Sequence, residues 1–89
     1  ILLIDIRHKP SDNDILMFNY IRSIGHNYIV LANKADKIAP TKVNSYVNDL
    51  RNSLEANDND VILPFSSSKK IYSEAVWNEI EKYISFNNN

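Results

Sequence analysis

Hydrophobic positions along this chain fall into two kinds of pattern. Three short stretches are almost continuously apolar and rich in β-branched residues: Ile1–Ile6, Tyr28–Ala32 and Val61–Phe65. Continuous runs of this length are typical of strands that are buried on both faces of a parallel sheet. The chain therefore predicts three buried strands.

Apolar residues between and after these runs recur at helical spacing. Ser11 is placed to cap a first helix and Gly25 to end it. Thr41 is placed to cap a second helix, whose apolar stripe is Val43, Tyr46, Val47, Leu50 and Leu54. A third helix is expected over residues 72–86, with four residues facing inward: Ala75, Val76, Ile80 and Ile84.

The predicted elements follow one another as strand and helix three times, without a hairpin signal. This order predicts an α/β fold in three layers, in which right-handed crossovers join parallel strands and helices cover the sheet. Ligands of such sheets bind where the strands have their carboxyl ends. The loops after Ile6, Ala32 and Phe65 are therefore the candidate functional loops.

The composition narrows the possible functions only slightly. The 89 residues can hold one domain, which we place at residues 1–86 with a disordered tail at 87–89. A formal net charge of −1 gives no reason to expect membrane or nucleic-acid binding through bulk charge. The lack of Cys excludes disulfides and thiolate metal sites. No apolar stretch approaches the roughly 20 residues of a membrane span, so a location in the cytoplasm or an organelle matrix is expected.

The second apolar run leads directly into Asn33-Lys34-Ala35-Asp36. A carboxylate at the end of a strand can accept hydrogen bonds from two adjacent donors of guanine, N1–H and N2–H₂. Adenine presents an acceptor at N1, and a site built for a donor rejects it because polar groups then stay unpaired. Asp36 is thus the expected guanine acceptor. Asn33 can contact the base, and the methylene stem of Lys34 can lie against the purine face.

A second loop carries residues that suit the same base. The third apolar run is followed by Ser66-Ser67-Ser68-Lys69-Lys70. Small residues leave backbone N–H groups accessible, and one directed at guanine O6 would complete the recognition begun by Asp36. The two loops follow neighbouring strands of the predicted sheet, so they are expected at one edge.

The order Asn33-Lys34-x-Asp36 and then Ser66-Ser67 resembles the last two guanine-nucleotide motifs of the Ras-like P-loop GTPases. Nearly the whole chain, from Leu2 to about Ile84, is similar to one family of that class, the EngB (YihA/YsxC) GTPases of bacteria and organelles. The residues that carry this similarity include Leu3-Ile4-Asp5-x-Arg7-His8-x-Pro10, Asp14, Met17, Asn33-Lys34-x-Asp36-Lys37, Phe65-Ser66-Ser67 and Trp77.

The resemblance implies a protein that binds GTP and GDP, hydrolyses GTP to GDP and phosphate, and takes part in assembly of the large ribosomal subunit. The implied partners are a guanine nucleotide and a precursor of that subunit. The implied base-binding residues are Asn33, Lys34, Asp36, Ser66 and Ser67. Among these, Ser67 would direct its backbone N–H at O6. The family has a Lys-x-Gly after the Ser-Ser loop, whereas Tyr72 stands in place of the Gly here.

The phosphate-binding parts of such a GTPase are missing from the sequence. It contains no G-x-x-x-x-G-K-[ST], and its single Gly, Gly25, cannot form a phosphate cradle. In the family, the residues that hold Mg²⁺ and γ-phosphate precede the position of Ile1, and the chain lacks an initiator Met. We therefore expect the C-terminal, guanine-reading half of a longer domain, unable to hydrolyse GTP alone. The alternative is an interaction or structural fragment without measurable nucleotide binding.

Asp5 and His8 each allow two interpretations. Asp5 could be the acidic site of an unrelated flavodoxin-like or receiver-like sheet, but we favour a loop anchor that pairs with Arg7 or with a backbone donor. His8, between Arg7 and Lys9, could contact ribosomal RNA, but we favour a structural turn.

Three further expectations concern packing. Asp60 is expected to be a turn residue, and Trp77 is expected to pack in the core. The strand at Leu2–Ile6 would expose an apolar edge in the absence of a neighbouring strand. Unprotected strand edges pair with other chains, so self-association through Leu2–Ile6 is expected.

Overall fold

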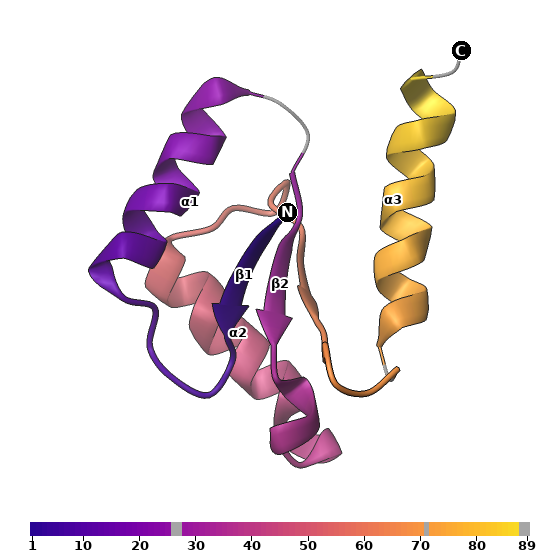
Figure 1. The fold of residues 1–89 in the computed structure, drawn as a ribbon. Helices are drawn as coiled ribbons and strands as arrows, with labels where there is room; N and C mark the ends of the chain where they lie inside the picture. The colour runs from indigo at the N-terminus through magenta and orange to yellow at the C-terminus, as the bar shows by residue number, and fades with distance from the viewer. Residues whose placement is uncertain (26–27, 71, 88–89) are drawn as a thin grey trace.

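The computed structural model describes residues 1–25, 28–70 and 72–87. Residues 88–89, which belong to the tail expected at 87–89, lie outside this part. In chain order the elements are β1 (Leu2–Asp5), α1 (Asp12–Ile24), β2 (Val30–Asn33), η1 (Ala35–Lys37), η2 (Pro40–Lys42), α2 (Val43–Leu54), β3 (Ile62–Pro64) and α3 (Ser73–Asn87). Strands and α-helices alternate as predicted, and η1 and η2 are short 3₁₀ helices in the β2–α2 connection (Figure 1).

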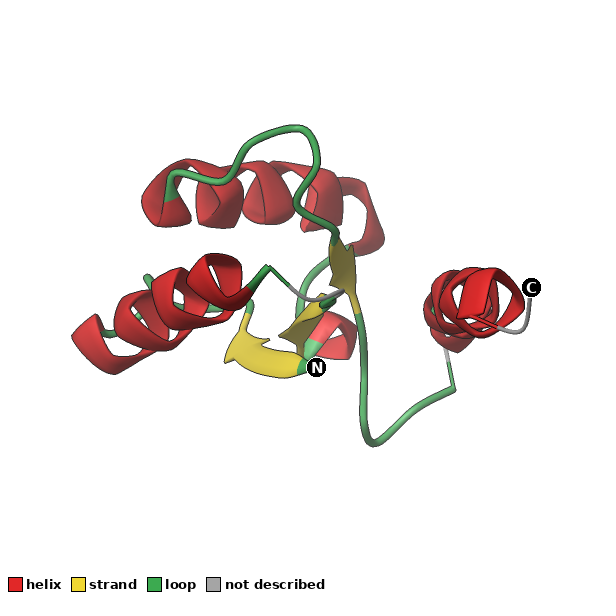
Figure 2. Ribbon diagram, turned by 90° about the horizontal axis from the view of Figure 1, so that it is seen from above, coloured by secondary structure: helices red, strands yellow, loops and turns green. Residues whose placement is uncertain are grey.

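The three strands form a parallel sheet in the order β1-β2-β3. Asp5 pairs with Asn33, and Ala32 pairs with Pro64, so the strands end at the same edge. Helices α1 and α2 cover one face of the sheet, and α3 lies on the other (Figure 2). The predicted parallel α/β arrangement is confirmed. No helix in the described ranges is long and apolar enough to cross a membrane.

The larger core lies between the sheet and the pair α1 and α2. Alternate strand residues Ile4, Val30, Ala32 and Ile62 point into it, where they meet fully buried Phe18 of α1. The predicted stripe of α2 is confirmed, since Val43, Val47, Leu50 and Leu54 are buried. Burying a Phe or Leu side chain stabilises a fold by about 1.5–3 kcal/mol, so this face provides most of the stabilisation.

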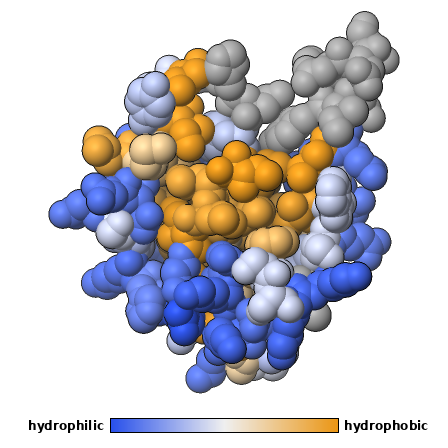
Figure 3. Space-filling view, in the orientation of Figure 1, coloured by the Kyte–Doolittle hydropathy of each residue, from blue (hydrophilic) through white to orange (hydrophobic). Residues whose placement is uncertain are grey.

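The other face of the sheet has a smaller core. Ile29 and Leu31 pack against Val76 of α3, and Ile80 is half-buried beside them. Leu3 of β1 is 54% exposed. Figure 3 looks between α1 and α3 onto the β1 side of the sheet and shows an apolar patch near its centre. The edge strand β1 is therefore left partly uncovered in the described chain.

The face of α3 that packs against the sheet differs from the predicted one. Val76 and Ile80 face inward as expected, but Ala75 is exposed, and the side chain of Ile84 lies outside the described part. The prediction that Trp77 packs in the core is wrong, because its side chain is 62% exposed. Each helical residue is rotated by about 100° from the last, so a helix that buries Val76 turns Trp77 outward.

The helix ends follow the predicted capping in α1 but not in α2. The Ser11 hydroxyl accepts a hydrogen bond from the Asp14 N–H at 3.1 Å, and the Asp14 carboxylate accepts one from the Ser11 N–H at 2.9 Å. Gly25 ends α1 at φ 80°, a left-handed conformation that glycine adopts without a side-chain clash. Thr41 is not the cap of α2. It lies in η2, and α2 begins after Lys42 without a side-chain cap.

Asp60 is a turn residue, as predicted, since its N–H donates to the Asn57 carbonyl at 3.0 Å, but its carboxylate is buried. Its side chain is only 2% exposed and lies 3.8 Å from the Arg22 guanidinium. One carboxylate oxygen accepts a hydrogen bond from the Tyr28 hydroxyl, and the other accepts one from the Asn57 N–H at 2.9 Å. Arg22 in turn stacks 5.1 Å from the ring centroid of Phe18. This network joins the end of α1, the start of β2 and the turn before β3.

We predict that Asp60→Ala lowers the free energy of unfolding by about 3 kcal/mol, since it removes a buried acceptor shared by Tyr28, Asn57 and Arg22. Urea unfolding followed by circular dichroism measures the change. Asp58→Ala, in the same turn but exposed, is the control and should change the free energy by less than about 0.5 kcal/mol. Equal values for the two variants would contradict the structural role of Asp60.

Candidate functional site

Two backbone hydrogen bonds hold the loop after β2 against the loop after β3. The Phe65 N–H donates to the Ala32 carbonyl at 2.9 Å, and the Ala35 N–H donates to the Phe65 carbonyl at 3.0 Å. They continue the strand pairing past the end of the sheet. As a result, Asp36 lies beside Ser66, thirty residues away in sequence.

Asp36 has a fixed carboxylate. The Ser66 hydroxyl donates to its Oδ1 at 2.9 Å, and the Ser68 hydroxyl lies 3.5 Å from Oδ2. The Lys37 ammonium is 3.9 Å from Oδ2, and the Asp36 side chain is only 3% exposed. The hydrogen bond from Ser66 lowers the pKa of Asp36 below 3.8, the ordinary aspartate value. The side chain is therefore an oriented anion at neutral pH.

Ser66 and Asn33 stabilise the loop around this carboxylate. Ser66 is buried, and its hydroxyl oxygen accepts a hydrogen bond from the Lys69 N–H at 3.0 Å while its proton goes to Asp36. The Ser67 N–H donates to Asn33 Oδ1 at 3.3 Å. The predicted residues thus form two hydrogen-bonded pairs across the two loops, Asp36 with Ser66 and Asn33 with Ser67, and the pairs are adjacent because Ser66 and Ser67 are consecutive.

Lys34 points to the other side of the site, toward β1. Its backbone is left-handed at φ 67°, ψ 29°, which costs a non-glycine residue about 1 kcal/mol. Its ammonium lies 3.6 Å from Asp5 Oδ2. Asp5 accepts three hydrogen bonds from Arg7, one from the backbone N–H and two from the guanidinium. These bonds hold the pKa of Asp5 well below its usual range, and the predicted Asp5–Arg7 pairing is confirmed.

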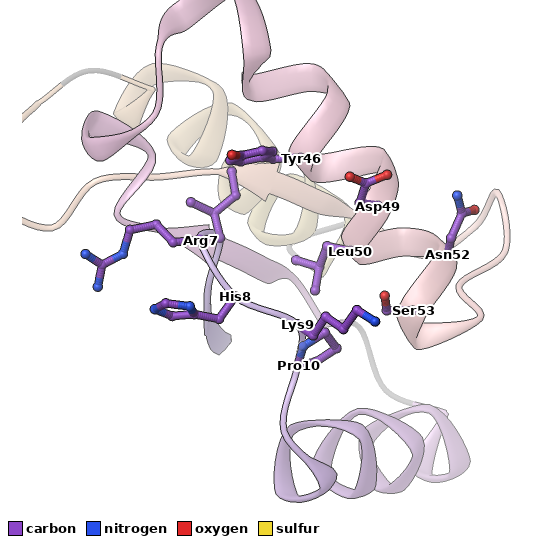
Figure 4. A pocket seen from close by; sticks show the side chains of 10 residues that line it. Arg7, His8, Lys9, Pro10, Tyr46, Asp49, Leu50, Asn52 and Ser53 are labelled. Atoms are coloured by element: carbon purple, nitrogen blue, oxygen red, sulfur yellow. The ribbon is translucent and has the colours of Figure 1, made fainter.

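A pocket of about 400 Å³ lies away from this group. Figure 4 shows loop residues 7–10 on one side and Tyr46, Asp49, Asn52 and Ser53 of α2 on the other. The five predicted base-binding residues do not line it. They lie at the edge of the sheet where the strands have their carboxyl ends. Within the described ranges, no group of three or more His, Asp or Glu side chains is placed to hold a metal ion.

Sequence reasoning missed two contacts of the site. The contact of Ser68 with Asp36 is not among the predicted ones, although the position of Ser68 in the Ser66-Ser67-Ser68 run could have indicated it. The approach of Lys34 to Asp5 could have been inferred from the strand register, because both residues stand at the ends of adjacent parallel strands.

The chain is similar to curated GTP-binding proteins. It is 39% identical over 83 residues to the probable GTP-binding protein EngB of Lachnospira eligens, a match that covers 93% of this chain and 39% of that protein. It is 39% identical over 79 residues to the probable GTP-binding protein EngB of Clostridioides difficile, which covers 89% of this chain and 39% of that protein. The chain thus spans about two-fifths of these relatives. No family model matches the chain.

We predict that Asp36 titrates below pH 3.8 and that Ser66→Ala raises its midpoint toward 3.8. The hydroxyl donates to the charged form, so its removal makes protonation easier. Since the pKa is lower in the folded state, the stability that Asp36 contributes is complete above its unfolded pKa and is lost as pH falls through the folded value. Carboxyl ¹³C NMR measures the midpoint.

The control for this titration is Ser67→Ala, because Ser67 contributes its backbone N–H to the site. Its Asp36 midpoint should equal that of the unsubstituted chain. An unchanged midpoint in Ser66→Ala would show that the Ser66 hydroxyl does not stabilise the carboxylate.

Proposed function

Because this chain resembles the EngB GTP-binding proteins over about nine-tenths of its length, we propose that it is the guanine-recognition part of a GTP-binding domain. The observation that carries this proposal is the Asp36 carboxylate, oriented by the Ser66 hydroxyl at the carboxyl edge of a parallel sheet. Such edges are where ligands of α/β sheets bind.

The proposed chemistry uses the lone pairs that Ser66 leaves available. An ionised carboxylate has about four acceptor positions, and the Ser66 hydroxyl takes one on Oδ1. Asp36 can therefore accept from guanine N1–H and N2–H₂ while it stays held by Ser66. The Ser67 N–H, which donates to Asn33 at a long 3.3 Å, is then available to O6. Lys34 supplies a methylene stem for the face of the base.

The function of the complete protein is a further part of the proposal. The relatives are named as GTP-binding, and the chain spans about 39% of their length. We assign GTP hydrolysis, Mg²⁺ binding and the phosphate cradle to segments outside this chain, since it contains no G-x-x-x-x-G-K-[ST]. A role in large-subunit ribosome assembly, in the cytoplasm or an organelle matrix, is proposed from the family resemblance alone.

Taken by itself, the chain is expected to bind nucleotide weakly. Base contacts must overcome the entropy lost on association, and the sequence holds no phosphate cradle to add binding energy. The competing description, an interaction or structural fragment without measurable nucleotide binding, differs in one observable. It predicts that GDP at millimolar concentration shifts no amide resonance in the loops at Asn33–Lys37 and Ser66–Lys70.

We predict that Asp36→Asn changes the preferred base from guanine to xanthine. The amide of Asn presents a donor where xanthine carries a carbonyl in place of the guanine amino group. Affinity for GDP should fall by about tenfold or more, because a hydrogen bond to a charged group is lost. NMR titration with guanosine and xanthosine diphosphates measures both affinities. Asp49→Asn, on the exposed side of α2, is the matched control, and an unchanged preference in Asp36→Asn would refute the assignment.

We also propose that two copies of this chain associate through the edge strand. β1 pairs with β2 on one side only in the described sheet. Leu3 of β1 and Ile1, directly before the strand, are both exposed. Figure 3 shows an apolar patch on the side of the molecule where β1 lies. A strand edge with these properties is suited to strand addition.

Sedimentation should accordingly show dimers at high concentration, and Leu3→Lys should shift the equilibrium to monomer because a charge on an edge strand opposes pairing. Leu16→Lys on α1, an exposed position outside the edge strand, should leave the dimer intact. A chain that stays monomeric at every concentration would count against association through β1.

A further inference from the structure

Asp5 reaches the predicted base-binding loop from the neighbouring strand. It ends β1 directly opposite Asn33 in the parallel register. The next residue along β2, Lys34, leaves the sheet in a left-handed conformation and places its ammonium 3.6 Å from Asp5 Oδ2. Asp5 therefore contacts Lys34, the one predicted base-binding residue that belongs to neither the Asp36–Ser66 pair nor the Asn33–Ser67 pair.

The Asp5 side chain is the fixed partner in this contact. Arg7 donates to Oδ1 from its backbone N–H at 2.9 Å and from Nε at 3.1 Å, and to Oδ2 from Nη2 at 2.9 Å. Three bonds from one residue leave the carboxylate little freedom. Lys34 has a long stem with several rotatable bonds, and its side chain is 49% exposed. Without a partner, such a side chain samples many rotamers.

We propose that Asp5 is a positioning residue for Lys34. It holds the ammonium at the β1 end of the loop, so that the methylene stem is ordered beside the base that Asp36 reads. This inference rests on the proposed function. It adds the Asp5–Arg7 pair to the site as a support that touches the lysine and makes no contact with the base.

The charges around Asp5 make its contact with Lys34 sensitive to ionic strength. One carboxylate lies between two cations, Arg7 and Lys34, so the group carries a net positive charge. Arg7 holds the carboxylate at hydrogen-bond distance, while the longer and more exposed Lys34 contact is screened by salt. The ordering of Lys34 should therefore weaken as ionic strength rises, whereas the Arg7 contact should change less.

The first test follows Lys34 in this chain without any nucleotide. Asp5→Asn keeps the shape of the side chain and removes its charge. ¹³C relaxation of the Lys34 ε-methylene should show increased mobility in Asp5→Asn, and the same increase in the unsubstituted chain at high salt. Asp12→Asn removes an exposed charge at the first turn of α1 and should leave Lys34 unchanged. Equal Lys34 mobility in Asp5→Asn and the unsubstituted chain would overturn the proposal.

The second test measures binding by NMR titration with guanosine and xanthosine diphosphates. Asp5→Asn should weaken both by the same factor of about two to five, as expected for loss of a partly exposed ion pair. Base preference should stay unchanged, in contrast to Asp36→Asn. In a Lys34→Met background, which keeps the stem without the ammonium, Asp5→Asn should have no further effect. An equal loss in both backgrounds would show that Asp5 acts on the fold rather than through Lys34.

The two proposals can fail separately. A lack of GDP-dependent shifts in the unsubstituted chain would contradict nucleotide binding by the chain, and the Lys34 relaxation would then decide the role of Asp5. GDP binding with an unchanged Lys34 in Asp5→Asn would keep the proposed function and reject Asp5 as a positioning residue.

Discussion

The parallel register of the three strands sets both the core and the candidate site. Asp5 pairs with Asn33, and Ala32 pairs with Pro64. Because side chains alternate between the faces of a strand, a slip of one residue would exchange the faces of an entire strand. Such a slip in β2 would turn Val30 and Ala32 away from the α1 and α2 core. It would also separate Asn33 from the end of β1. The hydrophobic pattern that fixes the core therefore also fixes which loops meet at the edge.

Polar contacts at the opposite end of the sheet complement this pattern. The Asp60 carboxylate binds the Tyr28 hydroxyl, and the Arg22 guanidinium lies beside it. Tyr28 stands at the entry to β2, and Asp60 at the entry to β3, so the network holds the starts of two neighbouring strands. At the carboxyl ends, the Asp36–Ser66 hydrogen bond joins the exits of the same two strands. The β2–β3 pair is thus held by a carboxylate at each end, Asp60 where the strands begin and Asp36 where they end.

Local sequence patterns were sufficient to predict most of the fold. The Ser11–Asp14 capping box and Gly25 act within a few residues of the chain, so their roles could be inferred without tertiary information. The juxtaposition of Asp36 and Ser66 could also be predicted, since it depends only on strand order. The burial of Asp60 could not, because its partners Tyr28 and Arg22 are more than thirty residues away. A run of Asn and Asp residues is more often an exposed turn, and only the packed structure shows that the Asp60 side chain is buried.

Errors in helix prediction have a similar physical origin. Thr41 is a good capping residue, but the chain enters α2 through the 3₁₀ turn that begins at Pro40, which places Thr41 inside that turn. Trp77 is large and apolar, but the phase of α3 is set by Val76 against Ile29 and Leu31. In both cases a neighbouring residue with a stronger constraint determined the geometry. The type of a residue therefore predicts its environment less well than its position next to a neighbour whose geometry is fixed, as Pro40 is beside Thr41 and Val76 is beside Trp77.

The left-handed turn at Lys34 shows how the site retains an unfavourable backbone conformation. Lys34 has φ 67°, where a glycine would avoid the steric cost. The turn is held from both sides, because the Ala35 N–H donates to Phe65 and the Lys37 N–H donates back to the Lys34 carbonyl at 3.0 Å. These bonds direct the chain into η1 and bring Asp36 back to Ser66. A glycine at this position would relieve the strain, but it would remove the methylene stem and the cation that meets Asp5. The left-handed conformation at Lys34 thus directs Asp36 to Ser66 and leaves the lysine side chain in contact with Asp5.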